Sequence, residues 1–278
     1  MDLSIAIVSW NTRDLLDECL KSIFETTHGI EFEVVVVDNA SSDDSVAMVR
    51  SKYPGVKLIT NDGNVGFAAA NNQAYQASIG RYFLLLNPDT ICLGNALASL
   101  VSFLDAREVV GAAGPLVLNP DRTLQFSWAR FPTFLNECLG KLDRRLSRAS
   151  AVPLSTDEVR ALGSFETDWV GGCCLMIRRE AVEQVGLMDE SLFMYCEETD
   201  WCMRLHKAGW RIMVEPNAEI VHLGGQSSVQ ASGKVTGYLR ASKSTYFAKH
   251  YGRLAGFALG AILAAKARAS RICGGIGL

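Results

Sequence analysis

A carboxylate directly after an apolar segment is the first feature that could do chemistry. The apolar segment 82–86 is followed by Asn87, Pro88 and Asp89, so Asp89 is expected at the end of a buried strand. A carboxylate at the end of a buried strand is held rigidly, and it could bind a divalent metal ion that bridges two phosphates. The simpler interpretation is a turn, because Asn, Pro and Asp all favour turns.

A second feature is the group of acids formed by Glu197, Glu198 and Asp200, at the expected start of a helix. Negative charge there is stabilised by the helix dipole, which by itself could explain the group. One of these carboxylates could instead be a general base that deprotonates an acceptor hydroxyl, since like charges nearby raise its pKa. His222 follows the strand-like segment 218–221 and could bind a metal, although a lone histidine is more often structural.

The elements that must position these residues alternate between strand and helix patterns. This order predicts an α/β domain with a largely parallel, Rossmann-like sheet covered by helices on both faces. Ligand sites in such sheets lie at the carboxyl ends of the strands, which selects Asn11, Asp38 and Asp89. The expected strands span residues 3–9, 33–37, 56–59 and 82–86.

The second half of the chain is less regular. Residues 119–122 predict a turn between two strands, and residues 197–208 predict a helix. Segment 127–164 has no core pattern, so we expect an acceptor-side lid, with a solvated helical insertion as the alternative. The arginines assigned to this lid are Arg130, Arg144, Arg145 and Arg148.

The formal net charge of −3 hides an asymmetry between the two ends of the chain. Residues 234–278 contain Lys and Arg but no acid, so an acidic body ends in a basic tail. Residues 1–230 are expected to form the domain, and residues 231–278 a basic, apolar helical tail. A membrane surface is the expected contact, and nucleic acid is not, because the tail is apolar as well as basic. The alternatives are packing on the domain or on a second subunit of a homodimer. The residues expected in the lipid headgroup region are Phe257, Leu259, Ile262 and Leu263, with Lys266, Arg268 and Arg271 against anionic lipid.

The 8 cysteines form no CxxC pair, and the N-terminus lacks the pattern of a signal peptide. We therefore expect a cytoplasmic protein with reduced thiols, peripheral at the inner face of the cell membrane. The longest apolar stretch, 254–265, is shorter than the about 20 residues of a spanning helix.

Taken together, the motifs resemble the family 2 glycosyltransferases of GT-A fold, and among them the bacterial rhamnosyltransferases. The resemblance covers about residues 4–227 and implies a single GT-A-like domain. Its elements, in chain order, are Ile7 to Asn11, Val37 to Ser41, Asn64 to Asn72, Asn87 to Asp89, Trp169 to Gly172, Gly186 to Asp200 and Val221-His222.

The resemblance implies a role for each matching residue. Asp89 matches the last acid of the DXD motif, and His222 matches a second ligand of Mn²⁺ or Mg²⁺. Glu198 matches the catalytic base, which is usually Asp, and Glu197 and Asp200 remain candidates. Asp38 matches the contact to the nucleobase. The other residues of the donor site are Asn11, Asn64, Gly66, Asn71, Asn72, Trp169 and Asn87, which stands at the first DXD position.

The activity implied by the resemblance is inverting, metal-dependent transfer of a sugar, with dTDP-rhamnose as the favoured donor. The acceptor would be a glycan or a lipid-linked saccharide in cell-surface polysaccharide synthesis. A sugar-nucleotide nucleotidyltransferase is one alternative, but residues 10–13 lack the glycine-rich loop expected there. A catalytically silent sugar-binding or scaffold protein is another. A NAD-type site is excluded because no GxGxxG follows the first strand.

Overall fold

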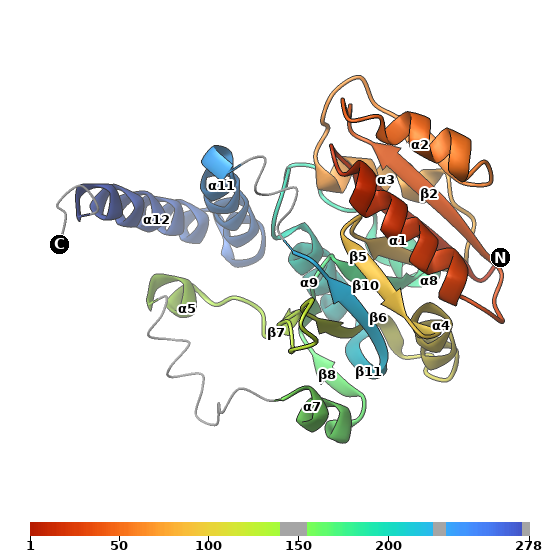
Figure 1. Cartoon of the computed structure of the whole chain (residues 1–278). Helices are drawn as coiled ribbons and strands as arrows, with labels where there is room; N and C mark the ends of the chain where they lie inside the picture. The colour runs from red at the N-terminus through yellow and green to blue at the C-terminus, as the bar shows by residue number, and fades with distance from the viewer. Residues whose placement is uncertain (140–154, 225–231, 274–278) are drawn as a thin grey trace.

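The computed structural model describes residues 1–139, 155–224 and 232–273. Within this part of the chain, a nine-stranded sheet lies between two layers of helices (Figure 1). The fold is α/β and GT-A-like, as the sequence predicts, and a C-terminal pair of helices follows the domain.

The N-terminal half forms four neighbouring parallel strands in the order β3-β2-β1-β4. Because β2 and β4 pair with opposite edges of β1, the strand order reverses there, and a crevice is expected at the carboxyl ends. The strands are β1 (Leu3–Ser9), β2 (Phe32–Asp38), β3 (Lys57–Thr60) and β4 (Tyr82–Leu86), and the helices between them are α1 (Arg13–Thr26), α2 (Ser45–Lys52) and α3 (Phe67–Gln76).

In the second half, β10 runs antiparallel between β4 and β6, and β11 is parallel to β6. Two shorter strands, β5 and β8, pair antiparallel with β11, so the sheet is mostly but not wholly parallel. These strands are β5 (Thr90–Leu93), β6 (Val110–Leu118), β8 (Phe165–Thr167), β10 (Cys174–Arg178) and β11 (Arg211–His222). The helices are α4 (Ala96–Asp105), α8 (Arg179–Val185) and α9 (Glu197–Lys207).

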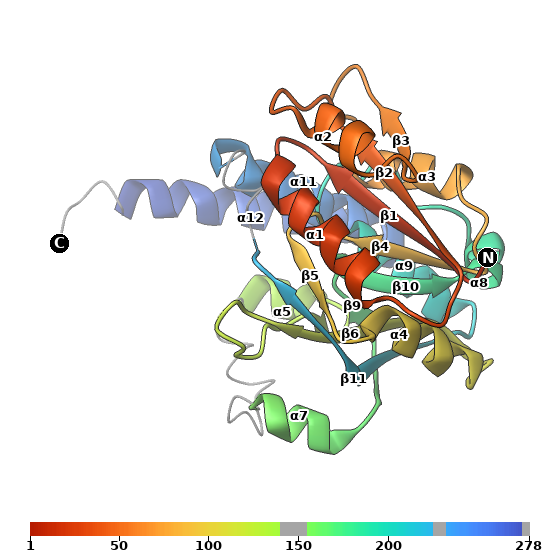
Figure 2. The same cartoon turned by 45° about the vertical axis from the view of Figure 1, so that its right-hand side comes forward.

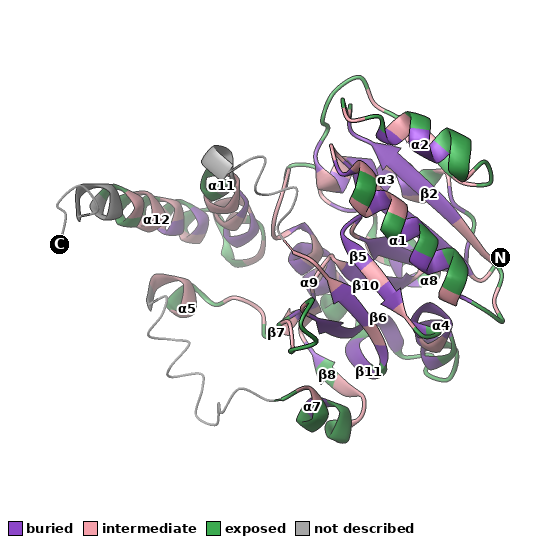
Figure 3. Ribbon diagram, viewed as in Figure 1, coloured by how far each residue is buried: buried purple, intermediate pink, exposed green. Residues whose placement is uncertain are grey.

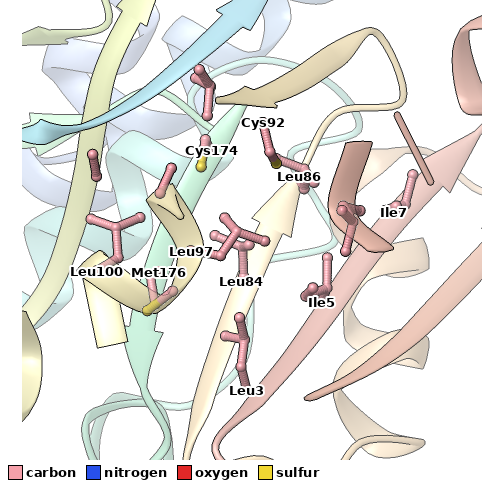
Figure 4. Packing of buried hydrophobic residues seen from close by; sticks show 14 of the residues in the cluster. Leu3, Ile5, Ile7, Leu84, Leu86, Cys92, Leu97, Leu100, Cys174 and Met176 are labelled. Atoms are coloured by element: carbon pink, nitrogen blue, oxygen red, sulfur yellow. The ribbon is translucent and has the colours of Figure 1, made fainter. Parts of the chain in front are cut away.

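Each face of the sheet has its own hydrophobic core. On β1, Leu3, Ile5 and Ile7 face α1, α2 and α4, whereas Ala6 faces α3, α8 and α9. This alternation follows from the period of two in a strand. Figure 4 shows the first core, and Figure 3 shows that the central strands, such as β4 and β6, are buried throughout. Burying one such Leu or Ile side chain stabilises the fold by about 1.5–3 kcal/mol.

Segment 127–164 begins with β7 (Trp128–Ala129), which pairs with β9 (Trp169–Val170) in a small second sheet. Two helices, α5 (Phe134–Leu139) and α7 (Thr156–Leu162), lie on either side of residues that the structure does not describe. Of the arginines assigned to the lid, Arg144, Arg145 and Arg148 lie outside the described residues. Arg130 forms an exposed ion pair with Asp168.

The tail forms α11 (Ser232–Tyr251) and α12 (Arg253–Cys273), and α12 extends away from the sheet (Figure 2). Tyr246 and Phe247 of α11 are buried beside α9, so α11 is packed on the domain. A Cβ on Gly256 would lie 2.6 Å from Ala248 Cβ, which explains the small residue where α11 and α12 touch. Leu259 is also buried, so its prediction as a lipid-facing residue was wrong. No helix in the described ranges combines the length and apolarity needed to cross a membrane.

Candidate active site

The turn after β4 places Asp89 beside β11. All residues of β4 are buried, and Asn87 N donates to the carbonyl of Cys173 over 3.0 Å. The carbonyl of Asp89 accepts a hydrogen bond of 2.9 Å from Leu223 N. Backbone contacts on both sides therefore fix the turn that carries the buried side chain of Asp89.

Three of the predicted site residues meet at this turn. His222 ends β11 and lies opposite Thr90 in the register with β5. Its Nε2 is 3.2 Å from Asp89 Oδ1 and 3.3 Å from Asn87 Nδ2. The tertiary fold thus joins His222 to a turn that is distant in the sequence.

The Asp89 and His222 pair has the donor set and the spacing of a metal-ligand pair. Ligands about 2.1 Å from a metal ion, on adjacent corners of an octahedron, are about 3.0 Å apart. The observed separation of 3.2 Å between Nε2 and Oδ1 is close to this value. Among the described residues, no group of three or more His, Cys, Asp or Glu could hold a metal ion. A metal ion here would need further ligands from phosphate or water.

The acids lie at the N-terminus of α9, after a strained turn. Tyr195 and Cys196 have φ of 71° and 67°, a left-handed conformation that non-glycine residues rarely adopt. Such residues cost of order 1 kcal/mol each and persist only where neighbouring contacts hold them. One such contact comes from α11, where Ser242 Oγ donates to the carbonyl of Met194 over 2.7 Å.

Glu197 and Glu198 differ in exposure. Burial raises the pKa of Glu197 well above its usual value, and the neighbouring charge of Glu198 adds to the effect. Within the described part of the chain, Glu197 Oε2 is buried without a hydrogen-bond partner. Glu198 is only half-buried, and partial burial also raises its pKa. Of the two, Glu198 has the more exposed side chain.

We call Asn87, Asp89 and His222 the metal side of the site, and Glu197 and Glu198 the acid side. The two sides meet at Gly172 and Cys173. A Cβ on Gly172 would lie 3.7 Å from Glu198 Cβ, and the Cys173 carbonyl accepts from Asn87 N. Burial, followed by the charges of Asp89 and Glu198, raises the pKa of Cys173 to about 12. The loop before β10 therefore lies between the two groups of predicted residues.

Asp200 lies in a different environment from the two glutamates. Its side chain is 0% exposed, and its oxygens accept from Arg204 Nε at 2.9 Å, Lys249 Nζ at 2.9 Å and His250 Nε2 at 2.7 Å. Burial alone would raise the pKa of Asp200, but the hydrogen bond from His250 and the charges of Arg204 and Lys249 outweigh it and lower the pKa to about 2. A carboxylate held in this way is a poor base, and we assign it to fixing α11 on α9.

Asn11 and Asp38 follow β1 and β2 at the same edge of the sheet. Asn11 Oδ1 accepts from Ser42 N at 2.7 Å, and Asp38 Oδ2 accepts from Ser41 N at 2.9 Å. Asp38 Oδ1 is buried and has no hydrogen-bond partner among the described residues. An unpaired buried carboxylate oxygen is costly, and an N–H of a bound nucleobase would satisfy it.

The segment 64–72 is fixed to the loop before α9. Gly66 has a φ of 89°, and a Cβ there would lie 2.6 Å from the ring of Phe193. Asn64 Oδ1 accepts from Gly66 N at 3.0 Å. Asn72 exchanges hydrogen bonds with the backbone of Met188, at 2.9 and 3.0 Å. This segment therefore links the donor side of the site to the acids.

Three of the predicted donor-site residues use their polar groups within the fold. Asn71 is buried, and its Nδ2 donates to the carbonyl of Phe67 over 2.9 Å. Asn72, also buried, is engaged by Met188 and Glu190. Trp169 Nε1 donates to the carbonyl of Arg130 over 3.1 Å, which ties β9 to β7. These contacts favour structural roles for all three residues.

A cleft of about 640 Å³ lies away from these residues, between α4, the His28 loop and β11. Its buried acid is Glu215, which accepts from Ser164 Oγ at 2.6 Å and from Asn217 N at 2.9 Å. The Glu215 carboxylate is therefore already hydrogen-bonded, and none of the predicted residues lines this cleft.

The sequence analysis missed three kinds of support for this site. Gln125 contacts His222, Ser242 holds the turn before α9, and Lys249 and His250 hold Asp200. All of them are remote in sequence from the residues they contact and belong to no motif. The sequence shows that the tail is basic, but it does not show that Asp200 is the acid that the tail contacts.

Comparison with known proteins identifies the family. The model of glycosyl transferase family 2 matches residues 4–186, and the chain belongs to this family. N-acetylglucosaminyl-diphospho-decaprenol L-rhamnosyltransferase of Mycobacterium tuberculosis is 28% identical over 235 residues, which cover 79% of this chain and 75% of that protein. Rhamnosyltransferase WbbL of Escherichia coli K12 is 25% identical over 230 residues, covering 78% and 82%.

Among solved structures, the mannosyltransferase PcManGT from Pyrobaculum calidifontis, in complex with GDP-Man and Mn²⁺, has a TM-score of 0.60. It is 19% identical to this chain, and the match covers 99% of this chain and 76% of that one. The likeness establishes a shared fold. The family and the fold together define the protein as a glycosyltransferase of GT-A type.

Proposed function

We propose that the protein transfers a sugar, with rhamnose favoured, from a nucleotide diphosphate donor to a hydroxyl of a glycan or lipid-linked saccharide, with inversion. The observation that carries this proposal is the convergence of Asp89, Asn87 and His222 at one strand end, across Cys173 from Glu198. The relatives named as rhamnosyltransferases support rhamnose, and dTDP-rhamnose is the corresponding donor.

On the donor side, Asp38 and Asn11 would receive the nucleobase, and Asp89 and His222 would hold Mn²⁺ or Mg²⁺. A bound divalent ion would neutralise the diphosphate leaving group. The backbone contacts of Asp89 with Leu223 keep its carboxylate in place before donor binds. Such preorganisation lowers the cost of placing charge at this position.

On the acceptor side, Glu198 would take the proton from the attacking hydroxyl. Its raised pKa makes it a stronger base than an ordinary carboxylate. Attack from the face opposite the diphosphate inverts the anomeric configuration and needs no covalent intermediate. Glu197 is the alternative base, and its burial argues against it.

The tail supports a further proposal, contact with the cytoplasmic face of a membrane that carries a lipid-linked acceptor. Leu254 and Phe257 of α12 are 86% and 78% exposed. Lys266 and Arg268 lie on the same helix and are also exposed, and residues 234–278 contain no acid. A helix that carries both exposed apolar side chains and basic ones suits an anionic lipid surface.

The activity is tested by incubating the protein with dTDP-rhamnose, UDP-N-acetylglucosamine or GDP-mannose, each with Mn²⁺ or Mg²⁺. Thermal shift should identify the donor, because a ligand at 100 times its Kd adds about 2.7 kcal/mol of stability. Transfer to a lipid-linked acceptor should release the nucleoside diphosphate, and NMR of the product should show the inverted anomer. Donor binding without turnover on any lipid-linked or glycan acceptor would favour the silent sugar-binding alternative.

A further inference from the structure

Gln125 lies on the hairpin after β6, outside every motif of the sequence, and contacts His222 directly. Its Oε1 is 2.6 Å from His222 Nδ1, and its Nε2 is 2.9 Å from the backbone carbonyl of His222. The same Nε2 is 2.9 Å from Asn119 Oδ1. One amide thus contacts both the ring and the backbone of a single histidine.

The orientation of this amide follows from its partners. A carbonyl oxygen only accepts, so the group that faces the His222 carbonyl must be the NH₂ of Gln125. Asn119 Oδ1 must also be the acceptor, because Asn119 Nδ2 faces the carbonyl of Leu124 at 3.3 Å and Thr123 Oγ1 at 2.9 Å. A reversed Gln125 amide would place its oxygen against two acceptors. Oε1 therefore faces the imidazole.

The orientation of the amide decides where the proton of a neutral His222 lies. Because Gln125 Oε1 can only accept, Nδ1 must carry the hydrogen, and Nε2 keeps its lone pair. That lone pair points toward Asn87 Nδ2 and Asp89 Oδ1, which is the side where a metal ion would bind. Metal-ligating histidines generally need a partner on the other ring nitrogen for this purpose.

We propose that Gln125 is a positioning residue that holds His222 in the Nδ1–H tautomer, with Nε2 directed at the metal site. This inference deepens the proposed function and rests on it for the role of the metal. The tautomer itself is a property of the protein alone and can be measured without metal or donor.

The test uses ¹⁵N-labelled full-length protein and long-range ¹H–¹⁵N spectra of its 4 histidines, with His222 assigned by His222→Asn. We expect the Nδ1–H tautomer in the wild type. Gln125→Met has a similar length but no acceptor, and it should lose this preference. Mn²⁺ affinity, measured by calorimetry with dTDP present, should fall about 10-fold or more, as for other partners of metal ligands.

Two further variants separate positioning from general damage. Gln125→Glu keeps an acceptor for Nδ1, so it should retain the Nδ1–H tautomer. It loses the donor to the His222 carbonyl and Asn119 Oδ1, so its Mn²⁺ affinity should lie between those of the wild type and Gln125→Met. Thr156→Val removes a hydrogen bond to the Arg122 carbonyl of the same hairpin, outside the contacts of Asn119 and Gln125, and should change neither. An Nε2–H tautomer in the wild type, or an unchanged tautomer in Gln125→Met, would overturn the proposal. Absence of Mn²⁺ binding by the wild type would contradict the proposed function, while the tautomer comparison would still decide the role of Gln125.

Discussion

The two sides of the site are held in different ways. Asp89, Asn87 and His222 lie on strand ends and are fixed by ladder and backbone hydrogen bonds of the central sheet. Glu197 and Glu198 begin a helix after a strained turn, and that turn is held by a helix about 50 residues further along the chain. The metal side therefore depends on the core, whereas the acid side depends on the docking of α11.

This difference implies that the two sides can be damaged separately. Changes where α11 docks should lower turnover and leave donor binding nearly intact. Changes at the strand ends should weaken donor binding, and turnover should fall as a consequence. The predictions below test that separation.

Asp200→Ala should have the largest effect. It leaves Lys249 and Arg204 beside an empty buried position, and breaking a buried pair in this way costs about 3–5 kcal/mol. We expect lower stability in urea and reduced turnover, with near-normal Mn²⁺ and dTDP affinity for the folded fraction. Asp189→Ala, which removes a partly exposed partner of Lys249, is the control and should cost much less. Equal losses of donor affinity and turnover in Asp200→Ala would show that the two sides are not independent.

Asp89→Ala should abolish the gain in donor binding that Mn²⁺ provides. This loss should exceed the about 10–100-fold fall in metal affinity expected when a residue that only supports a metal ligand is changed. The fold should persist, since the backbone of Asp89 keeps its hydrogen bond with Leu223. Titration of dTDP with and without Mn²⁺ measures the effect, and Asp121→Ala on the exposed hairpin is the matched control. Metal-dependent binding of normal strength in Asp89→Ala would exclude the metal role.

Glu198→Gln keeps the size of the side chain and removes its basicity. Turnover should fall roughly 10²-fold or more, with donor binding retained. Glu197→Gln is the matched variant at the neighbouring buried acid and should have the smaller effect. If Glu197→Gln is inactive and Glu198→Gln keeps full activity, the assignment of the base must be reversed.

Stability should also depend on pH through Asp200. Its pKa is about 2 in the folded protein against a usual value of 3.8, so the ionised form is favoured by folding. The resulting contribution, about 2–3 kcal/mol, is complete above the unfolded pKa and is lost as the pH falls through the folded pKa. Urea unfolding of the wild type should weaken more steeply over this range than that of Asp200→Asn. Parallel curves would contradict the role of Asp200 in the docking of α11.

The smallest effect concerns the exposed face of α12. The variant Leu254→Ser with Phe257→Ser should reduce sedimentation with anionic vesicles, because it removes the exposed apolar side chains of the helix. The basic residues that remain contribute only about 1 kcal/mol each near the surface. Leu162→Ser, on exposed α7, is the control for loss of a surface leucine. Equal pelleting of the three proteins, or none at low salt, would leave packing as the role of the tail.

The sequence by itself determined the α/β order, the strands β1 to β4 and the edge at which Asn11, Asp38 and Asp89 lie. Apolar runs and turn residues are local signals, and the edge follows because parallel strands end on the same side of a sheet. The lid arginines outside the described residues and the homodimer remain predictions.

Only the tertiary structure decided how the acids differ and what supports them. Glu197, Glu198 and Asp200 are equivalent as a sequence motif, yet one helical turn places Asp200 against Lys249 and His250 and leaves Glu198 half-buried. Gln125 likewise reaches His222 only because the hairpin after β6 lies beside the end of β11. Contacts between elements distant in the chain set burial, charge and hydrogen bonding, and these determine which of several similar residues can act as a base, a ligand or a support.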